Sequence, residues 1–108
     1  MQNFTENHFL LEEMYDDQYY PKFLVDKLKM VIMDMVGYLV IGGHNKDEIQ
    51  EKFDEMTINI NNLQEEFYEN DSEIETVARE CIAMDIEYII NYFNLAIDVE
   101  EALREREW

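Results

Sequence analysis

Glycine, proline and cysteine are scarce in this chain of 108 residues, which holds three glycines, one proline and one cysteine. So few backbone breakers suit long helices, and we expect an all-α fold. The single cysteine, Cys81, excludes an internal disulfide. There is no CxxC pair, no glycine-rich phosphate loop and no HExxH motif. We therefore expect no cofactor and no metal site, and we assign no catalytic residue.

Long apolar runs are also missing. The most apolar segment, residues 23–41, is interrupted by Asp26, Lys27, Lys29 and Asp34. A membrane span needs about 20 mostly apolar residues and does not tolerate this many charges. The opening "MQNFTENHFLLEE" has no basic region followed by an apolar run, so it does not resemble a signal peptide. The sequence predicts a cytoplasmic protein without a membrane partner.

Basic residues are few, with 8 lysines and arginines against 26 acids and a net charge of -18. Because 47% of the residues are apolar, the chain should still fold and keep its charge outside. Residues 46–75 hold 11 acids against Lys46 and Lys52, a net charge of -9. Such a field repels nucleic acid phosphates and attracts basic proteins. The candidate partner-binding residues are Glu51, Asp54, Glu55, Glu65 and Glu66.

The few breakers and the capping patterns mark helix boundaries. Pro21 fits the first turn of a helix, and the glycine pair at 42–43 ends it. Three further starts have a capping residue followed three positions later by glutamate, at Asn45, Ser72 and Asp98. We predict a compact bundle of three main helices, about 21–41, 46–69 and 73–93, in a single domain 1–108. Short terminal helices complete it, the first from Thr5 to about Met14, and residues 1–20 pack on the bundle as a helix and an aromatic arm.

The apolar faces of the first two main helices differ. In 46–69 one narrow stripe predicts a bundle seam, formed by Ile49, Phe53, Met56, Ile60, Leu63 and Phe67. In 21–41 the residues Met30, Met33 and Ile41 lie away from the core face. We expect the N-terminal arm to cover them, and a homodimer through these three residues is the alternative.

Asp85 lies at the centre of the apolar face of 73–93. A buried carboxylate needs partners, and we expect tyrosine hydroxyls or the amines of Lys27 and Lys29. His8 and His44 are expected to be ordinary surface residues. Two interpretations remain open: a buried acid that fixes helix register, which is favoured, or a carboxylate that handles a proton or a ligand. The candidate polar site comprises Asp85, Cys81, Tyr88, Tyr15, Tyr19 and Tyr20.

Three segments carry a family resemblance, "MYDDQYYPKFLVDK", "EIETVARECIAMD" and the closing "REREW". They resemble an uncharacterised bacterial domain-of-unknown-function family of small acidic helical proteins. The resemblance implies a helical fold and brings no function. From the residues, the best hypothesis is a non-enzymatic module that binds a basic protein through residues 46–75, of the inhibitor, antidote or nucleic-acid-mimic type. A small-ligand binder or enzyme with a pocket around Asp85 is one alternative, and an acidic surface that is only solvated is the other.

Overall fold

The protein is built from helices. The structure, a computed structural model, describes residues 8–108. It contains α1 (Glu12–Asp16), α2 (Lys22–Ile41), α3 (Lys46–Glu69), α4 (Thr76–Tyr92) and α5 (Val99–Ala102). No strand occurs within residues 8–108. The all-α class and the three main helices with short terminal helices are confirmed.

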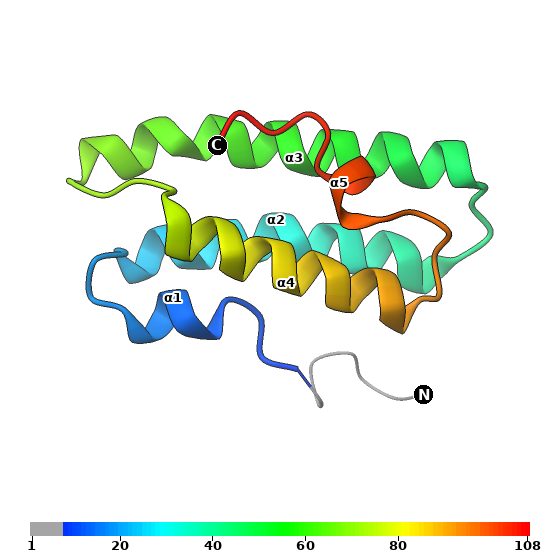
Figure 1. Cartoon of the computed structure of the whole chain (residues 1–108), viewed down its shortest axis with the longest axis horizontal. Helices are drawn as coiled ribbons and strands as arrows, with labels where there is room; N and C mark the ends of the chain where they lie inside the picture. Colours follow the sequence, from blue (N-terminus) through cyan, green and yellow to red (C-terminus); the bar gives the residue numbers. More distant parts are fainter. Residues whose placement is uncertain (1–7) are drawn as a thin grey trace.

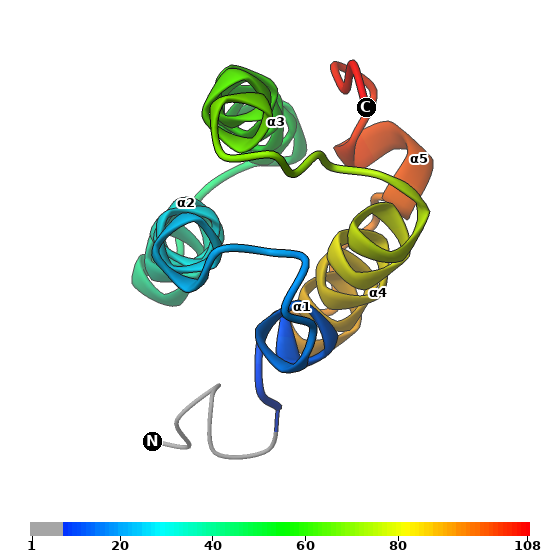
Figure 2. The ribbon, with the colours of Figure 1, turned by 90° about the vertical axis from the view of Figure 1, so that its left-hand side faces the viewer.

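The three long helices run alternately up and down around one core. α2 and α3 form an antiparallel hairpin, and α4 lies beside them and runs opposite to α3 (Figure 1). In the end view, α2, α3 and α4 stand at the corners of a triangle, with α1 next to α4 (Figure 2). α5 contacts both α3 and α4, so it closes the side of the bundle where these two helices face each other.

The core comes from the apolar faces that helical periodicity predicts. The seam of α3 is buried, with only its first member, Ile49, partly buried. The buried side chains from the other elements include Leu24, Leu28, Ile32 and Met35 of α2, Ile82, Ile86 and Ile89 of α4, and Leu10, Leu11 and Met14 near the N-terminus. Each side chain of this size contributes about 1.5–3 kcal/mol when it leaves water. None of the helices in residues 8–108 has the length and apolar character needed to span a bilayer.

The hairpin between α2 and α3 has the local chemistry that the sequence predicts. Gly42 and Gly43 have φ of 74° and 79°, which a side chain would strain, and they end α2. Asn45 then forms a capping box with Glu48, accepting from the Glu48 N–H at 2.8 Å while the Glu48 carboxylate accepts from the Asn45 N–H at 2.9 Å. Asp98 forms the same box at the start of α5.

The predicted helix start at Ser72 is wrong. α4 begins at Thr76, and Ser72 belongs to the end of α3, because its backbone N–H donates to the carbonyl of Phe67 at 2.9 Å. Asp71, with φ of 57°, reverses the chain just before it. This bond, spanning five residues, closes the C-terminus of α3 as in a Schellman motif. A capping pattern therefore falls inside a turn that ends the preceding helix.

The N-terminal arm packs on the bundle differently from the prediction. Thr5, the expected first residue of the N-terminal helix, lies outside the described residues, and the described helix α1 spans only Glu12–Asp16. α1 contacts α4 and α2. Met33 is partly buried, but the exposed fractions of Met30 and Ile41 are 72% and 81%. The expectation that the arm covers the far face of α2 is therefore wrong for Met30 and Ile41.

Candidate functional site

Asp85 is buried on the inner side of α4, as the periodicity predicts. Only 4% of the residue is exposed, and its neighbours one turn away, Cys81, Ile82 and Ile89, are buried as well. The opposite side of α4 carries the exposed Glu80 and Glu87. A carboxylate in such surroundings loses hydration and requires hydrogen-bond donors from the protein.

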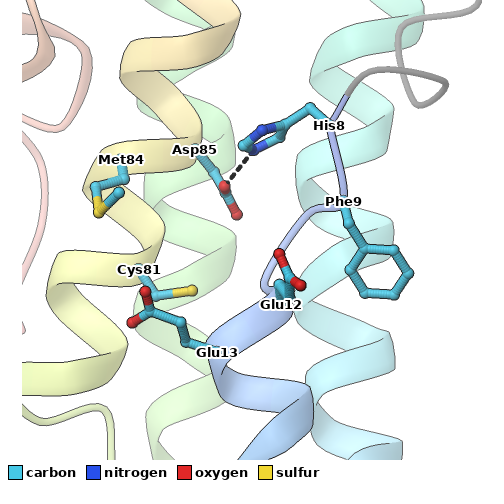
Figure 3. Close-up of a pocket in the computed structure, with 7 residues that line it drawn as sticks. All are labelled: His8, Phe9, Glu12, Glu13, Cys81, Met84 and Asp85. Atoms are coloured by element: carbon cyan, nitrogen blue, oxygen red, sulfur yellow. Dashed lines mark hydrogen bonds and ion pairs between the residues drawn. The ribbon is translucent and has the colours of Figure 1, made fainter.

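Two donors from the N-terminal segment satisfy this carboxylate. The Nε2 atom of His8 lies 2.6 Å from Oδ1 of Asp85, and the backbone N–H of Leu11 donates to Oδ2 at 2.7 Å. Figure 3 shows the imidazole reaching across from the segment before α1 to α4. Burial raises the pKa of Asp85, while the hydrogen bonds from His8 and Leu11 oppose that rise because they favour the charged form.

The bond from Leu11 explains what the buried acid does for the fold. Leu11 is the N-cap of α1, has no side-chain cap, is fully buried and has φ of 59°. This left-handed conformation is unfavourable for a leucine. Asp85 accepts from the N–H of the N-cap residue, as the glutamate of a capping box would, but it does so from another helix. The carboxylate therefore positions the start of α1 on α4.

His8 is also held by an aromatic stack. Its ring lies 4.0 Å from the ring of Tyr88, centroid to centroid, with 12° between the two planes. The side chain is 25% exposed, so the imidazole lies at the edge of the bundle between buried acid and solvent. The prediction that His8 is an ordinary surface residue is wrong. No spacing rule could have found it, because 77 positions separate His8 from Asp85.

The expected tyrosine and lysine partners are engaged elsewhere. Tyr15 donates its hydroxyl to Asp26 at 2.6 Å, and the hydroxyl of Tyr20 donates to Glu75. Tyr19 is exposed and packs edge-on against Tyr20. Lys27 pairs with Glu66, and the amine of Lys29 lies over the rings of Phe9 and Tyr15. The structure thus brings Cys81 and Tyr88 close to the Asp85–His8 pair, and it places the three arm tyrosines in other contacts.

A small hollow of about 80 Å³ opens beside the pair. Figure 3 shows its lining, which comprises His8, Phe9, Glu12, Glu13, Cys81, Met84 and Asp85. Burial, with the charge of Asp85 as a smaller cause, raises the pKa of Cys81 to about 11, so its thiol stays protonated and is a poor nucleophile. Within residues 8–108 no three histidine, cysteine or acidic side chains are grouped so that they could bind a metal ion.

The predicted partner-binding acids divide into two sets. Asp54 accepts two hydrogen bonds from Arg104, at 3.0 and 2.6 Å, and Glu66 pairs with Lys27 at 2.6 Å. Glu51 and Glu65 are exposed, and Glu55 is exposed with a longer contact of 3.4 Å to Lys52. The first set links α3 to neighbouring segments, and the second set points outward from α3.

The outward set extends along most of α3. At 100° per residue the exposed acids that lie within about 60° of Glu51 around the helix axis are Asp47, Glu48, Glu55, Glu65 and Glu69. We call these six residues the acidic face. Ile58, whose exposed fraction is 45%, lies near its middle.

The comparisons with known proteins assign the chain to a family but give no function for it. The model of a family of unknown function, DUF5713, matches residues 4–108, and the chain belongs to this family. No curated protein and no solved structure matches the chain.

Proposed function

We propose that this member of a family of unknown function binds a basic protein partner through the acidic face of α3. The observation that carries the proposal is the alignment of six exposed carboxylates along one side of a 24-residue helix. Such a helix is about 36 Å long at 1.5 Å per residue. An elongated field of one sign steers a partner of opposite sign and sets its orientation on contact.

Asp47 and Glu48 favour the first turn of α3, but the repulsion within the rest of the acidic face costs the isolated helix stability. Asp47 and Glu51, Glu51 and Glu55, and Glu65 and Glu69 are like-charged pairs four residues apart, each unfavourable by about 0.2–0.5 kcal/mol. The last turn of α3 contains no basic residue, so the negative end of the helix dipole meets Glu69 without compensation. A basic partner relieves both effects, and this supports a binding role over a surface kept only for solubility.

An apolar anchor lies within the face. Ile58 is exposed between the acids of the first and last turns, and Tyr68, with an exposed fraction of 59%, borders the face near its end. Apolar and aromatic side chains at the centre of an interface contribute most of the binding energy, while surrounding charges contribute rate and specificity. We therefore expect a protein surface with lysines or arginines around an apolar recess as the partner.

The hollow at Asp85 supports a structural role more than ligand binding. Both carboxylate oxygens already accept hydrogen bonds, and about 80 Å³ is well below the roughly 300–1,000 Å³ of small-molecule pockets. We accordingly assign Asp85 to the attachment of the N-terminal segment and not to a reaction.

The test compares two variants of equal net charge. One carries Glu51→Lys, Glu65→Lys and Glu69→Lys on the acidic face, and the control carries Glu73→Lys, Glu80→Lys and Glu87→Lys, which are exposed on and before α4. Three reversals of two charges each bring both variants from -18 to -12. A partner captured by the wild type and identified by mass spectrometry is purified, and its affinity for all three proteins is measured at low and physiological salt.

We expect the variant of the acidic face to lose at least tenfold in affinity and the control to stay near the wild type. The wild-type association rate should also fall steeply with salt. Equal losses in both variants would mean that only the overall charge matters. Full affinity in both would mean that the acidic face is a solvated surface.

A further inference from the structure

The surface of α2 differs in charge from the rest of the molecule. α2 carries three lysines against Asp26 and Asp34, a net charge of +1. The remainder of the chain carries five basic residues against 24 acids, a net charge of -19. Two copies of this protein repel each other through most of their surfaces, and the α2 side is where that repulsion is weakest.

The same side of α2 exposes a row of apolar positions. Phe23, Met30 and Gly37 are spaced by seven residues, so they lie on one line along the helix, and Ile41 follows one turn later. The exposed fractions of Phe23 and Met30 are 52% and 72%. Exposed apolar groups in one row are unusual on a monomer and indicate a contact surface.

No close contact within residues 8–108 explains the glycine at position 37. It lies in the interior of α2, where glycine is less favourable than alanine. A Cβ atom built on Gly37 would meet nothing within 4 Å, so no neighbour among the described residues 8–108 requires a glycine there. A glycine on an exposed helix face is explained when another chain approaches the backbone closely.

We infer that α2 binds a second copy of this chain in an antiparallel pair, with the twofold axis at Met30. Phe23 and Gly37 are equally far from Met30, so the phenyl ring of each copy lies over Gly37 of the partner subunit. A hollow of about 520 Å³ beside Gly37, lined partly by Met33, Tyr38 and Ile41, gives the ring space. The ring of Phe23 in each copy thus fits against Gly37 of the partner subunit, and the twofold axis makes this contact occur twice.

The charges beside the row are already paired within the chain. Lys27 and Asp34 lie on the same flank, on opposite sides of Met30, and they pair with Glu66 and Lys52 of α3. In the antiparallel pair Lys27 comes level with Asp34 of the partner subunit, so neutralised ion pairs flank the contact. A single helix pair buries less than the roughly 800 Å² per partner of a standard interface, so the dimer is weak and depends on concentration.

Sedimentation velocity of the full-length chain across a wide concentration range tests the dimer. Wild-type protein should form dimers at high micromolar concentration, and more readily with added salt, because salt screens the repulsion between two chains of net charge -18. Met30→Glu, which places two carboxylates on the axis, should be monomeric. The matched control is Met84→Glu on α4, whose methionine is 63% exposed, and it should dimerise like the wild type.

Gly37→Leu separates an interface from a purely structural effect. The larger side chain has open space in the monomer and improves helix propensity, so the melting temperature of the monomer should rise. Dimer affinity should fall at least tenfold because the ring of Phe23 loses its place. For the register, oxidised Met30→Cys should cross-link to itself, whereas the more exposed Ile41→Cys should not.

Three results would overturn the inference. These are a wild type that stays monomeric at every concentration, a dimer that survives both Met30→Glu and Gly37→Leu, and a dimer lost equally in Met84→Glu. Failure of the acidic-face proposal leaves this inference intact, because the two contacts use different helices and respond to salt in opposite directions.

Discussion

Replacing Asp85 by alanine removes the acceptor for two donors at once. The Leu11 N–H, which is fully buried, would be left without a partner, and a buried orphaned donor costs about 1–3 kcal/mol. His8 is partly exposed, so water can replace its lost partner at small cost. The raised pKa of Asp85 shows that burying the ionised carboxylate is itself unfavourable, and removing it recovers part of the loss. We expect a net loss of about 1–3 kcal/mol for Asp85→Ala.

Asparagine at the same position keeps an acceptor for Leu11 and gains an amide donor for the imidazole of His8. Asp85→Asn should therefore cost less than about 1 kcal/mol. Urea unfolding of the wild type, both variants and the exposed control Glu80→Ala measures the differences. Hydrogen exchange of the Leu11 amide then shows whether the start of α1 has detached. The reasoning fails if Asp85→Ala lies within about 0.5 kcal/mol of the wild type, or if Asp85→Asn loses as much as Asp85→Ala.

Two further predictions concern titration. Burial raises the pKa of Asp85 on folding, so the protonated carboxyl group favours the folded state. Its contribution to the free energy of unfolding is fully present below the unfolded pKa of about 3.9 and is lost as the pH rises through the folded pKa. Urea titrations from pH 4 to pH 7 should therefore show the wild type losing stability relative to Asp85→Asn; an unchanging difference would contradict this. The thiol of Cys81, with its pKa raised to about 11, should resist alkylation at pH 8 and react promptly in denaturant. Fast alkylation of the folded protein would show that the thiol is accessible.

Local signals account for the part of the fold that the sequence predicts well. The bounds 46–69 agree with α3 because a capping box at Asn45 and the glycine pair before it act within a few residues. Ser72 fails for a related reason, since serine followed by glutamate three positions later also suits the turn that ends a helix. Only the bond from its N–H back to Phe67 decides between the two.

Long-range partners account for the part of the site that the sequence could not predict. Helical periodicity predicts that Asp85 is buried, but its partner His8 is 77 positions away, and no pattern links the two. The pairing of Asp54 with Arg104 spans 50 positions and removes one acid from the expected binding face in the same way. Periodicity gives the face on which a side chain lies, and tertiary structure gives the group it meets.

The link from Asp85 to the N-terminal segment also orders events during synthesis. His8 leaves the ribosome long before Asp85, and at about 5–20 residues per second the 77 residues between them take roughly 4–15 s to make. During that time Leu10, Leu11 and Met14, which are buried in the finished protein, have no α4 to cover them. This segment is translated before α4 and can dock on it only afterwards, so its apolar side chains are exposed to chaperones and proteases in the interval.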